Sequence, residues 1–250
     1  MNTQTIHQFN TPEDAVKKLS ERIVRISDNC QSQNQRCHMA LSGGSTPKLL
    51  FQTLSSTYSD NINWNNLHVY WVDDRCVPPD HPESNYGMTK ATLFDLVSIP
   101  PENIHRMIGE ANPETEAKRY SNMLLTQIPL IENIPQFNLI ILGIGEDGHT
   151  ASIFPNQMDL LNVNTVCAVG IHPVSGQKRI TLTGKTICQA KEVVFLVTGP
   201  GKAVVISEIF NNTELAATYP AAHINPANKS AEWYLDGAAV KLISTKESCD

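Results

Sequence analysis

The chain has 250 residues and a formal net charge of −6, and 41% of its residues are hydrophobic and 18% charged. This composition is ordinary for a globular protein, and the length allows one large α/β domain or two small ones. The negative net charge argues against a nucleic-acid partner and against binding to an anionic membrane surface. We find no apolar run of about 18 residues and no secretory signal pattern, so we expect no membrane span and a cytoplasmic protein.

The six cysteines show neither a CxxC pair nor a regular spacing. Such spacings do not suit a zinc site, and a cytoplasmic protein keeps its thiols reduced. We therefore expect free thiols and no metal at positions 30, 37, 76, 167, 188 and 249.

The first half of the chain alternates helices with strands. Thr11 can cap a helix that starts at Pro12, whose fixed φ suits a first turn, and apolar residues at helical spacing continue to Ile26. A polar loop is expected at 31–35. Apolar periodicity and turn residues then predict strands at 38–41 and 67–72 and helices near 48–54 and 85–96.

The second half continues the same alternation. It predicts a helix near 113–125, strands at 137–142, 166–171 and 193–198, a helix at 203–210 and a weaker strand at 233–235. Strands alternating with helices indicate a mostly parallel, Rossmann-like sheet with helices on both faces. We expect one α/β domain over residues 1–250.

Four predicted strands end in unusual residues, at 42–47, 73–75, 143–150 and 199–202. The carboxyl ends of parallel strands share one edge of a sheet, where ligands of α/β proteins bind. The segment after 137–142 is the most informative: three glycines in six positions accompany Asp147 and His149. Histidine titrates near neutral pH, so His149 is the candidate general base and Asp147 its orienting partner. A histidine merely hydrogen-bonded within a turn is the structural alternative.

The turn at 42–47 lies between a strand and a helix. Gly43 and Gly44 expose backbone N–H groups, Ser45 adds a hydroxyl, and a helix start favours an anion. The sequence is neither GxGxxG nor a P-loop, so it predicts no particular nucleotide. A tight turn with a Ser or Thr cap is an equally good interpretation of this segment alone.

Three cations add to the candidate site. Lys202 follows two glycines at another predicted helix start, and Arg179 lies in the segment KRITLT; each can hold a phosphate, and each alone is more often a solvated surface cation. Arg75 follows an acid pair at the end of an apolar strand, either as a salt-bridged loop anchor or as a ligand for substrate oxygens. Asp74 is the candidate carboxylate for a substrate hydroxyl, with Asp73 left open.

Together these segments resemble the 6-phosphogluconolactonases and, more broadly, glucosamine-6-phosphate deaminases and ribose-5-phosphate isomerases. The resemblance rests on LSGGSTP (41–47), VDDRCVPPDHPESNYGM (72–88), LGIGEDGHTASIFP (142–155), KRITLT (178–183) and GPGKA (199–203). Deaminases typically have an aromatic residue where this chain has Arg75, and an acid just before the proline corresponding to Pro155. Both differences favour the lactonases.

The resemblance implies hydrolysis of 6-phospho-D-glucono-1,5-lactone to 6-phosphogluconate in the pentose phosphate pathway, without cofactor or metal. In this hypothesis His149 activates water, Asp147 orients His149 or the sugar, and Arg75 stabilises the oxyanion or binds hydroxyls. The expected phosphate ligands are Gly43, Gly44, Ser45, Arg179 and Lys202. The alternatives are a deaminase-like aldose–ketose isomerase and a sugar-phosphate sensor that binds without turnover.

Overall fold

A seven-stranded sheet forms the centre of the computed structural model, which describes residues 4–226 and 230–243. Every neighbouring pair of its strands is parallel. In spatial order the strands are β1 (Thr5–Phe9), β12 (Glu232–Asp236), β11 (Val193–Val197), β8 (Leu139–Leu142), β2 (Cys37–Leu41), β3 (Leu67–Trp71) and β5 (Ile104–His105).

The inner strands β11, β8, β2 and β3 are buried along their whole length. A parallel strand covered on both faces has no solvent side, and this explains why these segments are mostly apolar, with His38 on β2 and His68 on β3 as buried exceptions. Their side chains belong to a single hydrophobic cluster that includes Trp71, Phe195 and Trp233.

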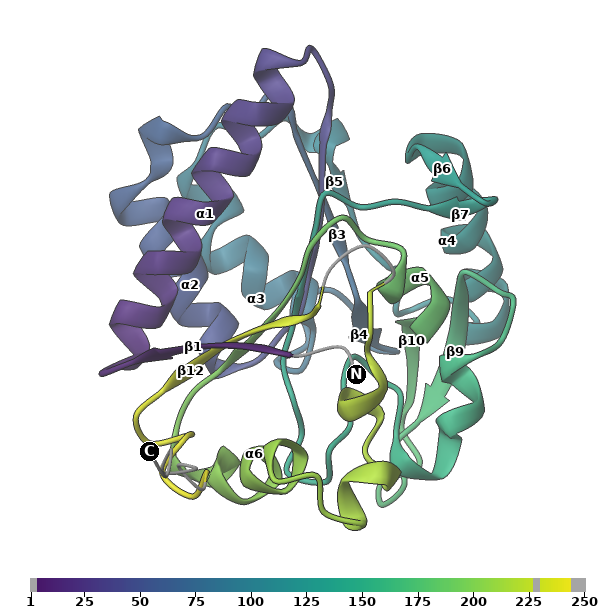
Figure 1. Cartoon of the computed structure of the whole chain (residues 1–250). Coiled ribbons are helices and arrows are strands. Elements are labelled where there is room, and N and C mark those ends of the chain that lie inside the picture. Colours follow the sequence, from purple (N-terminus) through teal and green to yellow (C-terminus); the bar gives the residue numbers. More distant parts are fainter. Residues whose placement is uncertain (1–3, 227–229, 244–250) are drawn as a thin grey trace.

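Three helices cover one face of the sheet, on the left of Figure 1. They are α1 (Pro12–Ser32), α2 (Ser45–Thr57) and α3 (Asn85–Thr92). Thr11 caps α1 as expected, because its hydroxyl accepts a bond from the amide of Asp14 at 3.1 Å.

The other face carries a small antiparallel sheet with two helices outside it, on the right of Figure 1. The sheet has the order β4 (Asp73–Arg75), β10 (Lys178–Leu182) and β9 (Cys167–Ile171), and the helices are α4 (Pro113–Gln127) and α5 (Gly184–Cys188). A hairpin, β6 (Leu130–Ile131) with β7 (Ile134–Pro135), follows α4, and α6 (Ala203–Phe210) follows β11. The described 3₁₀ helices are Ser59–Asn61, Phe94–Leu96, Pro101–Asn103, Pro155–Leu161, Pro200–Lys202, Leu215–Thr218 and Pro220–His223.

The predicted α/β class and parallel sheet are confirmed, and α6 has the expected bounds. The predicted loop at 31–35 was partly wrong, because α1 continues to Ser32 and buries Cys30 on its apolar face. The predicted helix at 85–96 breaks at Leu93, where the backbone leaves the helical region. The strand at 166–171 exists, but it joins the antiparallel sheet because its neighbour is β10, which sequence reasoning did not recognise as a strand.

The short strands β4, β6 and β7 were also missed, as were β1 and β5. The strands β1 and β5 lie at edges of the large sheet, and β5 has only two residues, so neither shows the apolar run of an inner strand. The described cysteines are free of disulfides, whereas Cys249 lies outside the described residues. No helix in the described part of the chain is long and apolar enough to cross a membrane.

Candidate active site

The four unusual segments follow β2, β3, β8 and β11, which are consecutive parallel neighbours in the large sheet. Their carboxyl ends therefore share one edge. A cavity of about 110 Å³ opens there and draws its wall from three of these segments and from β10. Its lining residues are Ser42, Gly43, Asp73, Arg75, Asn85, Gly143, Ile144, His149, Ala151 and Arg179.

His149 and Asp147 form a hydrogen-bonded pair at this cavity. Nδ1 of His149 lies 2.6 Å from Oδ1 of Asp147, and the same oxygen accepts the backbone N–H of His149 at 3.2 Å. Burial raises the pKa of the Asp147 carboxyl, but the bonds from His149 outweigh it and leave the pKa below its usual value. An ionised Asp147 keeps the proton of a neutral imidazole on Nδ1, so Nε2 is free to accept a proton.

Two glycines make this pair possible. A Cβ on Gly145 would lie 2.1 Å from Nδ1 of His149 and 2.4 Å from Oδ1 of Asp147, so only glycine leaves room for the contact. Gly148 has φ +80°, which L side chains rarely adopt, and Tyr219 packs where its Cβ would be. The glycine-rich sequence is therefore required by the geometry of the two side chains.

Arg75 and Arg179 form the cationic wall of the cavity. They face each other in the register of β4 and β10, an arrangement in which like charges repel. The Nε of each is buried without a hydrogen-bond partner, and neither forms an ion pair within residues 4–226 and 230–243. Burial, and then the neighbouring Arg75, lower the pKa of Arg179 despite the opposing effect of Asp73. The guanidinium of Arg179 lies over the ring of Phe154, 5.5 Å from its centroid, and the enclosed Nε donors of both arginines remain open to an anion.

Asn85 positions Arg75. Its Oδ1 accepts a bond from one guanidinium nitrogen at 3.1 Å, and the carbonyl of Glu83 accepts a second from the same nitrogen at 2.7 Å. Asn85 in turn donates to the carbonyl of Asp73 at 2.9 Å and lies directly over Gly43, where a Cβ would be 1.7 Å from its Oδ1. Sequence reasoning missed Asn85. Its signal was its place in the segment VDDRCVPPDHPESNYGM (72–88), which also contains Arg75.

The two acids at 73 and 74 have different surroundings. Asp73 lines the cavity, and its Oδ2 accepts a 2.6 Å bond from the hydroxyl of Ser152, another residue that sequence reasoning missed. Asp74 does not line the cavity. Its carboxylate accepts the backbone N–H groups of Arg75, Asn85 and Tyr86 at 2.8 to 3.1 Å, and burial raises its pKa to about 6 despite these bonds.

The expected role of Asp74 as a substrate ligand therefore does not fit this geometry. Its oxygens hold the start of α3 and the loop before it, so it acts on the scaffold of the site. Asp73 is the acid of this pair that reaches the cavity, and a period of two along β4 explains why only one of them does.

The turn at 42–47 forms the start of α2, which begins at Ser45 and thus earlier than predicted. Gly44 is the residue before the helix, with φ +113°, and provides no side-chain cap. The first amides of a helix have no partner within it, so those of Ser45 and Thr46 are available to an anion. Thr46 contacts Thr198 at 2.8 Å between hydroxyl oxygens, which joins this helix start to the segment of Lys202.

The structure thus places Gly43, Arg75, His149 and Arg179 on one cavity wall and holds Asp147 against His149. Gly44, Ser45 and Lys202 do not line that cavity; they lie in adjoining segments beside it. Among the described residues, no group of three or more His, Cys, Asp or Glu is placed to hold a metal ion.

The fold and the site define an α/β protein with a cavity that is lined by two arginines beside a histidine–aspartate pair, at the carboxyl edge of a parallel sheet. A family model described as glucosamine-6-phosphate isomerases/6-phosphogluconolactonase matches residues 10–233. The chain belongs to this family.

Individual relatives agree over nearly the full length. A protein of Haemophilus influenzae named 6-phosphogluconolactonase is 48% identical, over 94% of this chain and 98% of its own. The crystal structure of a devB protein superposes with a TM-score of 0.90 at 42% identity, covering 97% of this chain and all of the other. The 6-phosphogluconolactonase of Trypanosoma brucei superposes with a TM-score of 0.84 at 27% identity, over 98% of this chain and all of its own.

Proposed function

We propose that this protein hydrolyses 6-phospho-D-glucono-1,5-lactone to 6-phosphogluconate, with His149 as the general base. The observation that carries the proposal is the juxtaposition in one cavity of the His149–Asp147 pair with two arginines whose enclosed Nε atoms have no hydrogen-bond partner. A phosphorylated lactone matches both parts of this site: its phosphate is an anion that suits the arginines, and its carbonyl is an electrophile that suits the His149–Asp147 pair. The names of the relatives at 48% and 27% identity favour the same substrate.

The reaction needs one proton acceptor that later becomes a donor. Nε2 of neutral His149 takes a proton from water while the water oxygen bonds to the lactone carbonyl carbon. The tetrahedral intermediate carries a negative oxygen, for which the cavity offers guanidinium donors of Arg75. When the bond from that carbon to the ring oxygen breaks, the imidazolium returns its proton to the ring oxygen, and the carboxylic acid product ionises.

Asp147 contributes through His149. Its carboxylate holds the Nδ1 proton, which keeps Nε2 directed at the reacting atoms and stabilises the imidazolium formed in the first step. Assistance of this kind is worth about 10²–10⁴-fold in rate, which suffices for a lactone because its carbonyl is already activated.

The phosphate is assigned to the cationic side of the site. We propose Arg179 as its guanidinium ligand, with the free amides at the start of α2 near Gly44 and Ser45, and Lys202 as a further cation. The proposal is supported by the unpartnered Nε of Arg179 and by the contact that joins the α2 start to the Lys202 segment.

The assay uses freshly generated phosphogluconolactone and follows acid release against the spontaneous rate, alongside ammonia release from glucosamine 6-phosphate. Rapid acid release without ammonia is the expected result. Ammonia release instead would assign the site to a deaminase. Thermal stabilisation by 6-phosphogluconate with no turnover of either substrate would make the protein a sensor. Both of these outcomes contradict the proposal.

A further inference from the structure

A second, larger cavity of about 500 Å³ lies at the opposite edge of the sheet from the active site. It is lined by the segments that lead into β2, β8 and β11 and by the end of α4. Its lining residues are Gln35, Arg36, His38, Thr126, Gln127, Ile128, Pro129, Gln136, Asn138 and Lys191. The strand β2 separates the two cavities by five residues, or about 16 Å.

The lining of this cavity carries two positive charges, of which Lys191 also borders a neighbouring hollow that contains Asp28 and Glu192. The lining of the cavity itself contains Arg36 and Lys191 but no carboxylate. Over residues 4–226 and 230–243, neither cation forms an ion pair or a side-chain hydrogen bond. Glu192, the acid next to Lys191 in sequence, does not line the cavity and pairs with Arg22. An anion with two negative charges would match the two cations.

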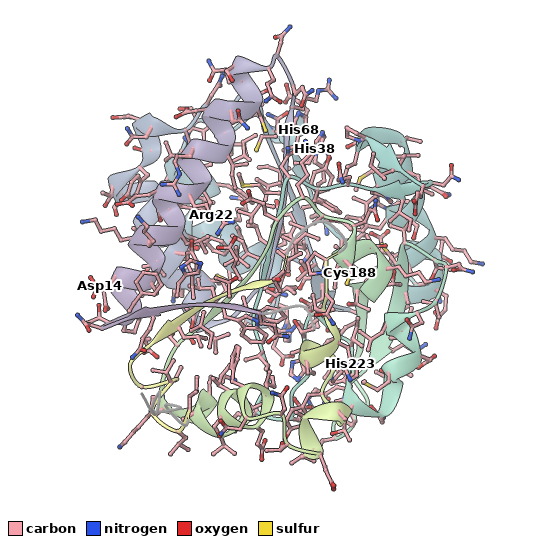
Figure 2. The ribbon with its side chains drawn as sticks, in the orientation of Figure 1. Asp14, Arg22, His38, His68, Cys188 and His223 are labelled. Carbon is pink, nitrogen blue, oxygen red and sulfur yellow. The ribbon has the colours of Figure 1, made fainter. Side chains whose placement is uncertain are left out.

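His38 gives the cavity a hydrogen-bond acceptor. The residue is only 3% exposed, yet it lines the cavity, and Figure 2 shows it beside His68 at one end of the molecule. Its Nδ1 lies 3.2 Å from the hydroxyl of Tyr70, which itself donates to Oε1 of Gln127 at 3.4 Å. In the arrangement in which Tyr70 donates to Gln127, Nδ1 of His38 donates to Tyr70 and Nε2 is left as an acceptor.

The histidine stays neutral, so this acceptor persists at physiological pH. Burial lowers the pKa of His38 to about 3, and the neighbouring charges of His68, His105, Arg36 and Lys191 act in the same direction. No hydrogen bond within the described residues uses Nε2, and the atom is not among the fully enclosed polar atoms that lack a partner. A ligand in the cavity can reach it with a hydroxyl group.

We propose that this cavity binds a small phosphorylated polyol, with the phosphate between Arg36 and Lys191 and a hydroxyl donating to Nε2 of His38. A phosphate monoester carries close to two negative charges at pH 7. The Nδ2 of Asn138 and the Oε1 of Gln136 are available for further hydroxyls, because Asn138 accepts from the amide of His38 through Oδ1 and Gln136 donates to the carbonyl of Gln189 through Nε2. The volume lies within the usual range for small-molecule sites.

The test is calorimetric titration with glycerol 3-phosphate, using Arg179→Gln as the background in which active-site binding is weakened. Binding is expected there, and the further double variant Arg36→Gln/Lys191→Gln should weaken it at least about tenfold, since both bonds are charge-assisted. Both cations are exposed, so the fold should be retained. The matched control is Lys17→Gln/Lys118→Gln, which removes the same charge from exposed positions outside both cavities.

Nitrogen-15 NMR of the His38 ring supplies an independent readout. The Nε2 resonance should shift on saturation in wild type and in Arg179→Gln. An unchanged Nε2 resonance, or equal weakening by the double variant and its control, would overturn the proposal. If the protein proved not to be a lactonase, both binding measurements at this cavity would keep their expected results. A failure of this proposal can therefore be told apart from a failure of the proposed function.

Discussion

Two groups of buried arginine in this molecule have opposite surroundings. Arg22, labelled in Figure 2, donates to both oxygens of Glu232 at 2.5 and 2.6 Å and to Glu192 at 2.8 Å. Burial lowers the pKa of Arg22, but these acids outweigh it and raise the pKa above its ordinary value. At the active site, by contrast, burial lowers the pKa of Arg179, and its Nε has no partner.

This difference distinguishes an arginine that stabilises the fold from arginines that we expect to bind a ligand. Arg22 links α1 to β12 and to the segment before β11, so its interactions are complete in the free protein. Arg179 and Arg75 lie side by side, and neither forms an ion pair with another described residue, so we expect an anion to bind between them. Four substitutions test this contrast and the role of His149.

The largest effect is expected for His149→Ala. Loss of the proton acceptor should lower kcat by about 10²–10⁴-fold, while KM and the melting temperature change little, because the side chain is partly exposed at the surface of the cavity. Acid release from fresh lactone, measured with thermal unfolding, checks both. Full activity in a folded variant would remove His149 from the mechanism.

Arg179→Gln should reduce kcat/KM by about 10²-fold, the worth of one charge-assisted bond to phosphate. Folding stability should stay equal or rise, because the substitution removes a half-buried charge whose Nε has no hydrogen-bond partner and relieves repulsion with Arg75. Steady-state kinetics and urea unfolding of the free protein give the two values. A marked loss of stability would show that Arg179 is structural.

Arg22→Gln is the same substitution at the arginine that stabilises the fold, and we expect the opposite effects on stability and activity. It removes the cation that Glu192 and Glu232 share, so the free energy of unfolding should fall by about 2–3 kcal/mol, with kcat/KM of the folded fraction unchanged. Urea unfolding compared with Arg179→Gln measures the contrast directly. Equal stabilities of the two variants would abolish the distinction between them.

The smallest effect is a pH dependence. The bonds from Arg22, the largest influence, lower the pKa of Glu232 from 4.5 to about 2. A carboxyl with a depressed folded pKa stabilises the protein above its unfolded pKa, and this stabilisation is lost as the pH falls from about 5 towards 2. Glu232→Gln should therefore be less stable than wild type at pH 7, with the gap narrowing in acid. A gap that is constant over this range would contradict the assignment.

Much of the fold could be predicted from the sequence because inner strands of a parallel sheet are apolar runs, as at 137–142. The same reasoning could not recognise β10, whose polar start at Lys178 reads as a surface segment until β4 and β9 pair with it. The candidate site was predictable where glycines mark a required contact, as around His149. It failed at Asp74 and Asn85, because the direction of a side chain on a short strand or at a helix start depends on tertiary partners.

The central claim is that the reacting carbonyl lies at His149 while the anion is held by the unpaired arginine wall. A crystal structure with bound 6-phosphogluconate tests it most directly. The account predicts the product carboxylate within hydrogen-bonding distance of Nε2 of His149 and a phosphate oxygen bonded to Nε of Arg179. A product bound with its carboxylate away from His149, or with its phosphate away from Arg179, would contradict it.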